Sequence, residues 1–271
     1  MSPSTDLHPF DQAVALELTG PDCFQGQIPQ TYANMVGPFG GVIAAVALNS
    51  ILQHPERQGD PISLTVNFAG PIADAPFAVT ARAVRTNRSN QHWCVELTQG
   101  EQVAVTATAI LAKRQETWSD AELRAPEAPP AESVQSWPVS AGPIWIQRYN
   151  LKFIRGILTL SGKPTADSQS LLWVRDEPPR PLDFLSLMAM SDVFFPRVFI
   201  RQQKRAPVGT VTITTHFHAD AEALARQADR SILAAARGQR FYRNYFDQTA
   251  ELWSDTGELL ASSSQMVYFK D

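Results

Sequence analysis

Asp192 is a side chain whose surroundings suit acid–base chemistry. It lies near the end of an apolar stretch, Leu182 to Phe195, four positions after Met188. If that stretch is a helix, this spacing places the carboxylate on or beside the buried face. Burial disfavours the charged form, so the pKa of the carboxyl group should rise and make it a better base. The alternative is that Asp192 only ends the helix before Pro196 or pairs with Arg197.

Two further polar residues lie in predicted β-strands. Thr210 opens the stretch Thr210 to Phe217, whose even positions share one face opposite the apolar face. Threonine is a common strand residue, so its hydroxyl gains a role only if it lies beside Asp192. Gln265 lies in the last predicted strand, where it either faces solvent or holds a water molecule without competing for its proton.

Other residue patterns give no support for a metal or cofactor site. His216 and His218 share one strand face, but no third ligand stands at a convincing spacing, so we expect two surface histidines and no metal. Cys23 and Cys94 are far apart, and we expect no disulfide framework. The chain has neither G-x-x-x-x-G-K nor G-x-G-x-x-G, and we expect no cofactor.

The chain has 271 residues, of which 44% are hydrophobic and 18% charged, and this composition predicts a globular protein. A net charge of −4 gives no basic field for a phosphate backbone, so nucleic acid is not an expected partner. The first ten residues lack the basic and apolar regions of an export signal, which predicts a cytoplasmic protein. The longest apolar stretch, Gly40 to Leu48, is too short to span a bilayer, and we expect no membrane segment.

The elements that must position these residues fall into two similar halves. In the first half, the spacing of Val42, Ile43 and Val46 after a Gly-Gly pair predicts a buried helix of about 12 residues. Gly40 and Gly41 at its start either donate backbone N–H groups to an anion or allow close packing. Strands are predicted at Val14 to Leu18, Cys23 to Ile28, Ser63 to Phe68, Phe77 to Arg85, Trp93 to Thr98 and Val103 to Leu111.

The second half repeats this pattern after a stretch rich in Pro, Ala and Glu. We expect domains at residues 1–116 and 144–271, joined by a linker at 117–143. The strand that contains Phe217 repeats the alternation of the strand that contains Phe68, an offset of 217 − 68 = 149 residues. The other strands are predicted at Trp145 to Ile154, Ser170 to Arg175, Arg230 to Ala236, Ala250 to Trp253 and Leu259 to Phe269. The pattern predicts a duplicated α+β fold.

Several short stretches stand in the order and at the spacing of one family. They are Gly37 to Gly41, Leu64 to Phe68 with Pro71, Leu97 to Gly100, Ser191-Asp192, Thr210, His216 to His218, Leu252 to Leu259 and Ser264-Gln265. With these residues the chain resembles the acyl-CoA thioesterase II family over nearly its whole length apart from the linker. The resemblance implies a double hot-dog fold, in which two tandem repeats each wrap an antiparallel sheet around a central helix.

The resemblance also implies an activity and its residues. In that family an Asp, a Thr and a Gln of the second hot-dog hold and activate the water that attacks a thioester carbon. By position these are Asp192, Thr210 and Gln265, and the substrate is an acyl-CoA. Thr212 stands where the best-known members carry an acidic residue, and 238–249 looks longer and more aromatic, so the acyl group preferred is left open.

The substrate is expected in an apolar channel between helix and sheet, with CoA at the surface. Gly40 and Gly41 are candidates for binding the thioester oxygen, and Phe194, Phe195 and Tyr242 are candidates for lining the pocket. Two alternatives stay open: a non-catalytic acyl-CoA or lipid-binding protein, and a hot-dog enoyl-CoA hydratase or dehydratase. The latter needs a catalytic histidine, and none falls at the start of a predicted central helix. Open sheet edges favour a homo-oligomer.

Overall fold

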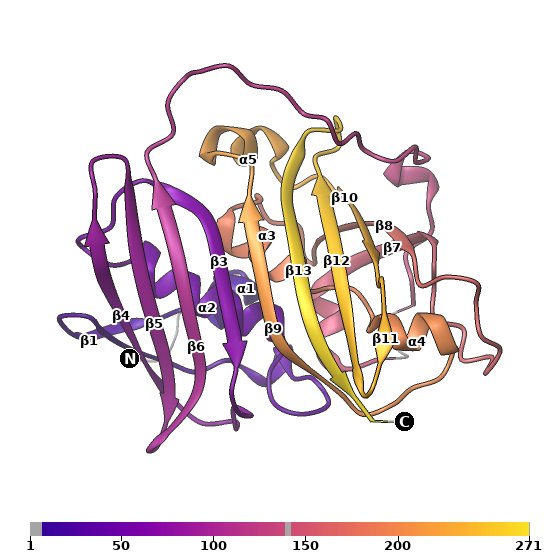
Figure 1. Cartoon of the computed structure of the whole chain (residues 1–271), viewed down its shortest axis with the longest axis horizontal. Helices are drawn as coiled ribbons and strands as arrows, with labels where there is room; N and C mark the ends of the chain where they lie inside the picture. The colour runs from indigo at the N-terminus through magenta and orange to yellow at the C-terminus, as the bar shows by residue number, and fades with distance from the viewer. Residues whose placement is uncertain (1–6, 139–141, 271) are drawn as a thin grey trace.

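One antiparallel sheet runs through both halves of the chain in a computed structural model that describes residues 7–138 and 142–270 (Figure 1). The strands of the first half are β1 (Glu17–Gly20), β2 (Cys23–Gly26), β3 (Asp60–Phe68), β4 (Phe77–Thr86), β5 (Asn90–Gln99) and β6 (Gln102–Ala112). Those of the second half are β7 (Tyr149–Arg155), β8 (Ser170–Asp176), β9 (Val208–Phe217), β10 (Ile232–Arg237), β11 (Phe241–Tyr242), β12 (Tyr245–Trp253) and β13 (Leu259–Phe269). Their order is β1-β2-β4-β5-β6-β3-β9-β13-β12-β10-β8-β7, and β11 pairs with β12.

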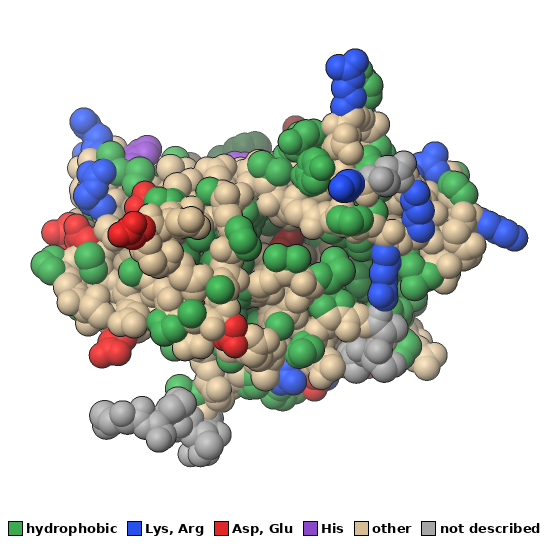
Figure 2. Space-filling model, turned by 90° about the horizontal axis from the view of Figure 1, so that it is seen from below, with side chains coloured by type: hydrophobic (Ala, Val, Ile, Leu, Met, Phe, Trp, Pro, Cys, Tyr) green, Lys and Arg blue, Asp and Glu red, His purple; other side chains and the backbone are tan. Residues whose placement is uncertain are grey.

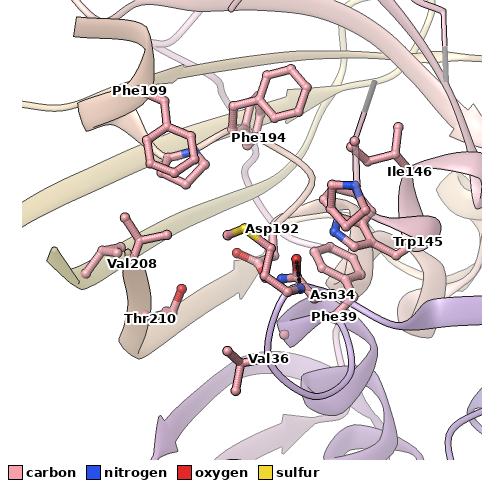
Figure 3. Close-up of a pocket in the computed structure, with 18 of the residues that line it drawn as sticks. Asn34, Val36, Phe39, Trp145, Ile146, Asp192, Phe194, Phe199, Val208 and Thr210 are labelled. Carbon is pink, nitrogen blue, oxygen red and sulfur yellow. Dashed lines mark hydrogen bonds between the residues drawn. The ribbon is translucent and has the colours of Figure 1, made fainter. Parts of the chain in front are cut away.

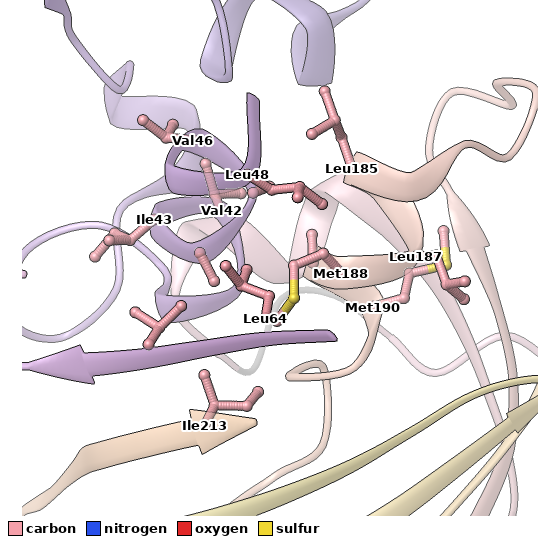
Figure 4. Packing of buried hydrophobic residues seen from close by; sticks show 14 of the residues in the cluster. Val42, Ile43, Val46, Leu48, Leu64, Leu185, Leu187, Met188, Met190 and Ile213 are labelled. Atoms are coloured by element: carbon pink, nitrogen blue, oxygen red, sulfur yellow. The ribbon is translucent and has the colours of Figure 1, made fainter. Parts of the chain in front are cut away.

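The two central helices lie side by side behind this sheet (Figure 1). They are α2 (Gly40–Leu52) and α3 (Phe184–Met190). Small and apolar residues on every side of α2 allow it to be buried all round, and Figure 4 shows its Val42 and Leu48 near Leu64 of β3 and Met188 of α3. The shorter helices are α1 (Pro9–Ala13), α4 (Arg197–Gln202) and α5 (Ala221–Gln227), with 3-10 turns at Gln30–Tyr32, Ala131–Ser133 and Ile144–Arg148.

The halves meet where β3 pairs with β9. Thr65 stands opposite Thr214, and their hydroxyl oxygens are 2.9 Å apart. These residues are separated by 214 − 65 = 149 positions, the same offset that the sequence predicts for the duplication. An antiparallel pair of equivalent residues places an approximate two-fold axis between the halves. A central helix against an antiparallel sheet, present twice, confirms the predicted α+β double hot-dog fold.

Two predicted strands are wrong at their starts. The stretch Val14 to Leu18 was expected to be extended, but helix α1 precedes it, with a proline in its first turn, and β1 begins only at Glu17. Similarly, the strand expected from Trp145 starts at Tyr149, because a 3-10 turn follows Pro143. Alternation cannot reveal such short helical turns, since they span only one or two side chains per face.

The predicted helix from Leu182 to Phe195 is shorter in the structure. Asp183 caps the N-terminus of α3 by accepting a hydrogen bond from the Ser186 N–H at 2.8 Å, and the helix ends at Met190. A tight turn then brings the chain to α4, which the sequence did not predict. This turn, and not the helix itself, carries Asp192.

The segment predicted as a linker packs against the outer face of the second half. Ala128 and Val134 lie against a small apolar cluster that includes Trp173 and Trp253. The indole N–H of Trp173 donates to the backbone oxygen of Pro129 at 2.9 Å. Residues 139–141 of this segment, like residues 1–6 and 271, lie outside the described residues, and the domain limits stay a prediction.

No helix within 7–138 or 142–270 has the length and apolar character needed to cross a bilayer. Cys23 and Cys94 are both free and exposed.

Candidate active site

A cavity of about 1320 Å³ lies between the two halves, at the end of the sheet where β3 finishes and β9 begins. Figure 3 shows Asp192 near its centre, with Phe194 and Phe199 on one side and Trp145 and Ile146 on another. Most lining side chains are apolar, and the charged ones among the described lining residues are Asp192 and Arg205. A large apolar pocket with a few polar groups is the usual form of a small-molecule site.

The Asp192 carboxylate is held by donors from both halves of the protein. Its Oδ1 accepts a hydrogen bond from Nε2 of Gln265 at 2.9 Å, and it also accepts one from the backbone N–H of Gly41. Arg197 does not pair with it, so that reading of the sequence is wrong. Asp192 is therefore fixed by neutral donors and not by a counter-charge.

Burial raises the pKa of Asp192 from 3.8 to about 7. The hydrogen bonds from Gln265 and Gly41 oppose this rise, but they are weaker than the desolvation. The carboxyl group can thus accept a proton near neutral pH, and because it lines the cavity a water molecule can reach it.

Gly40 and Gly41 allow the start of α2 to approach this carboxylate. A Cβ on Gly40 would lie 2.8 Å from Oδ2 of Asp192, and one on Gly41 would lie 2.5 Å from the backbone oxygen of Ala189 in α3. Both distances are too short for a side chain. The glycines therefore allow close packing, and the N–H of Gly41 also donates to an anion, the Asp192 carboxylate. Both roles that the sequence suggested for the Gly-Gly pair are present together.

Thr210 lies in the cavity wall, but on the face opposite to the one predicted. The pairing of β9 with β13 is interrupted by a β-bulge. Met266 pairs with Thr212 and the next residue, Val267, pairs with Thr210, so Val211 has no partner on β13. Val211 is 40% exposed, and Thr212 donates on the outer side to the backbone oxygen of Val66 at 3.1 Å. This bulge reverses the alternation and places Thr210 on the same inner face as Ile213.

Gln265 also lies on the inner face, and it is 5% exposed. It stands on β13 opposite Ile213 of β9 and reaches Asp192 of the α3–α4 turn. The structure thus brings Asp192, Thr210 and Gln265 to one cavity.

Two further buried polar residues, Gln248 and Arg197, lie in the same region, and the sequence pointed only to Arg197, as a partner for Asp192 that the structure does not show. Gln248 of β12 faces Gln265 across the sheet and lines the cavity, and its Oε1 accepts from Nε of Arg197 at 2.9 Å. Arg197 is fully buried, and desolvation lowers its pKa to about 9. Phe246, Ala250 and Leu252 alternate with polar residues, as expected of a strand, but the polar Gln248 on the same face interrupts the apolar side of the pattern and conceals the first half of this strand.

The predicted substrate contacts divide into two groups. Phe194 and Phe195 are buried and line the cavity. Tyr242 does not line the cavity: it lies on β11, is 52% exposed and stacks with the guanidinium groups of Arg240 and Arg243.

The histidines lie away from the cavity wall. His216 is exposed on the outer face of β9, and Nε2 of His218 lies 2.9 Å from the hydroxyl of Ser262. Within the part of the chain that the structure describes, no three His, Cys, Asp or Glu side chains are grouped as metal ligands would be. None of the described lining residues is a histidine.

Comparisons with known proteins identify the family of the chain. The model of the acyl-CoA thioesterase N-terminal domain matches residues 28–112, and that of the acyl-CoA thioesterase C-terminal domain matches 122–269. A hot-dog-fold protein of unknown function from Alicyclobacillus acidocaldarius is 44% identical, with a TM-score of 0.94, covering 98% of this chain and 99% of the other. No match was found among curated proteins.

More distant structures show the same fold. The acyl-CoA thioesterase II TesB2 from Mycobacterium marinum is 19% identical, with a TM-score of 0.76, covering 96% of this chain and 98% of the other. The tesB protein of Mycobacterium avium subsp. paratuberculosis is 17% identical, with a TM-score of 0.79, covering 97% and 98%.

Proposed function

Because the chain belongs to the acyl-CoA thioesterase family, we propose that it hydrolyses acyl-CoA thioesters to a free acid and CoA, with Asp192 as the general base. The observation that carries this proposal is the Asp192 carboxylate in the cavity wall, whose pKa burial raises to about 7 and which is held by Gln265 and Gly41. A base with a pKa near the working pH is the group that water activation needs.

In the proposed reaction, Asp192 takes a proton from a water molecule as the water oxygen bonds to the thioester carbon. The carbonyl electrons move to oxygen and form a tetrahedral oxyanion. When the C=O bond re-forms, the C–S bond breaks, and the CoA thiolate leaves with the electron pair and takes up the proton that Asp192 accepted, which restores the carboxylate. Gln265 offers its free Oε1 to the water, because its Nε2 is bound to Asp192, and the Thr210 hydroxyl supplies a further water contact.

The acyl chain would occupy the apolar part of the cavity beside Phe194 and Phe195. Figure 2 shows the end of the molecule where the cavity lies, hollowed near the centre, with several Lys and Arg side chains over the C-terminal half, while the other side carries most of the Asp and Glu together with a few Lys and Arg. This charge distribution suits the phosphates of CoA at the mouth, where Arg205 is a lining residue. Tyr242 lies outside the cavity, beside Arg240, so if it contacts the substrate it would contact the CoA part and not the acyl chain.

The hydratase or dehydratase alternative is not supported, because no described cavity residue is a histidine. A non-catalytic acyl-CoA binder would share this fold and cavity, and turnover distinguishes it. A cytoplasmic location and homo-oligomeric assembly stay predictions.

The test is thiol release from a panel of short to long acyl-CoAs by the wild type, Asp192→Asn and Gln265→Ala. We expect turnover by the wild type and its loss in Asp192→Asn, with a Tm that is not lowered. Binding of acyl-CoA by the wild type without turnover would refute the proposal in favour of a binding protein.

A further inference from the structure

Gln248 is a buried amide that the proposed reaction has not used. It lies on the inner face of β12, is 3% exposed, and stands directly opposite Gln265 of β13. Opposed residues of an antiparallel pair have Cβ atoms about 5 Å apart, so Gln248 lies one strand spacing from the residue that holds Asp192. It also lines the cavity.

The orientation of the Gln248 amide is set by Arg197. A guanidinium group can only donate, so the Gln248 atom that lies 2.9 Å from Nε of Arg197 must be the oxygen. The guanidinium is itself fixed by the backbone oxygen of Ser168 and the hydroxyl of Ser170, each at 2.9 Å. The Gln248 Nε2 group therefore carries its two N–H donors away from Arg197, and no hydrogen bond among residues 7–138 and 142–270 uses them.

The two donors that bind Asp192 are already engaged. Nε2 of Gln265 and the N–H of Gly41 both bind the carboxylate, so neither is free for a substrate oxygen. A positively charged group that donates to the oxygen of an amide polarises the amide and strengthens its N–H donors. Gln248 combines this polarisation with burial and a place in the cavity wall.

We propose that Gln248 Nε2 donates to the carbonyl oxygen of the thioester and stabilises the oxyanion formed when water attacks, with Arg197 as its positioning residue. This inference rests on the proposed hydrolysis for the identity of the substrate. Loss of one such donor lowers kcat by roughly 100- to 1000-fold and leaves KM almost unchanged, because the bond strengthens in the transition state.

Two substitutions test the donor. Gln248→Met keeps the length of the side chain and removes the amide. Gln248→Glu keeps an acceptor for Arg197, and so preserves the fold, but removes both N–H groups. We expect kcat to fall at least 100-fold in each, with KM within about threefold of the wild type. As the control, Gln227→Ala removes a buried glutamine of α5 that binds backbone groups away from the cavity, and it should leave kcat unchanged.

A second measurement does not depend on turnover. The ligand is a ketone analogue of acyl-CoA, in which a methylene replaces the sulfur and the carbonyl carbon is ¹³C. Infrared difference spectra of its complex should show the carbonyl stretch lowered in the wild type and in Gln227→Ala, and restored in Gln248→Glu. Arg197→Lys, measured on folded protein, should also restore it and lower kcat without raising KM.

These readouts separate the two proposals. A wild type that binds acyl-CoA without turnover contradicts the hydrolase, while the carbonyl band still decides the role of Gln248. The inference is overturned if Gln248→Glu retains kcat within threefold of the wild type, if its carbonyl band matches that of the wild type, or if the wild type does not bind the analogue.

Discussion

Replacing Asp192 with asparagine should stabilise the protein at neutral pH while it abolishes activity. Burial raises the pKa of Asp192 from 3.8 to about 7, so the folded protein binds this proton more tightly than the unfolded chain does. The associated stability is fully present below pH 3.8 and is lost as the pH rises through 7. Asparagine stays neutral at every pH and therefore avoids the loss.

The size of the effect follows from linkage. The rise from 3.8 to about 7 corresponds to about 4 kcal/mol of unfolding free energy once the carboxylate is ionised, of which about 2.5 kcal/mol develops between pH 5 and pH 8.5. Asparagine has one acceptor oxygen for the two donors of Gln265 and Gly41, which costs about 1 kcal/mol at all pH values. The variant should thus be about 3 kcal/mol more stable than the wild type at pH 8.5, and less than 1 kcal/mol more stable at pH 5.

Urea unfolding of the wild type and Asp192→Asn at pH 5, 7 and 8.5 measures this difference. Asp176 provides the control, because burial also raises its pKa to about 7 but it does not line the cavity. Asp176→Asn should show a similar pH-dependent gain in stability and keep its activity. A difference between wild type and Asp192→Asn that does not change with pH would show that the carboxylate is not held at a raised pKa.

Three further outcomes follow from the site. The kcat/KM of the wild type should rise about tenfold per pH unit up to pH 7 and then level off, because Asp192 must be ionised to accept a proton; a flat profile between pH 5 and 8 argues against it. Gly41→Ala should lower stability by about 1–3 kcal/mol and reduce activity, since its methyl group would meet Ala189; denaturation and thiol-release assays check both. Thr210→Val should lower kcat about tenfold, whereas Thr212→Val, on the outer face, should not; equal effects would contradict the bulge.

The elements with strong periodicity could be predicted from the sequence. Helix α2 begins at Gly40, where the Gly-Gly pair and the apolar spacing placed it, and the offset of 149 residues identifies the pair at the centre of the seam. The type of fold followed from these features together with the family resemblance. Periodicity succeeds here because burial imposes one regular pattern over many residues.

The details of the site depend on interruptions of that pattern. Thr210 reaches the cavity only through the bulge at Val211, and a bulge leaves no mark in residue types. Asp192 lies in a turn just after α3, and its pKa is raised by burial between the two halves, which the hydrogen bond from Gly41 of the other half only partly offsets. Gln248 was hidden in a polar stretch, because a buried polar residue has the same letter as an exposed one.

The β3–β9 seam also has a consequence for synthesis of the chain. The two strands are separated by 208 − 68 = 140 residues, so at ~5–20 residues per second β3 waits roughly 7–28 s on the ribosome for its partner. During that time β3 is an unpaired edge with an apolar inner face, which is the kind of strand that recruits other chains. A nascent or truncated first half, such as residues 1–116, should therefore pair with a copy of itself through β3. In the full chain, β9 of the second half covers this edge and so prevents such aggregation.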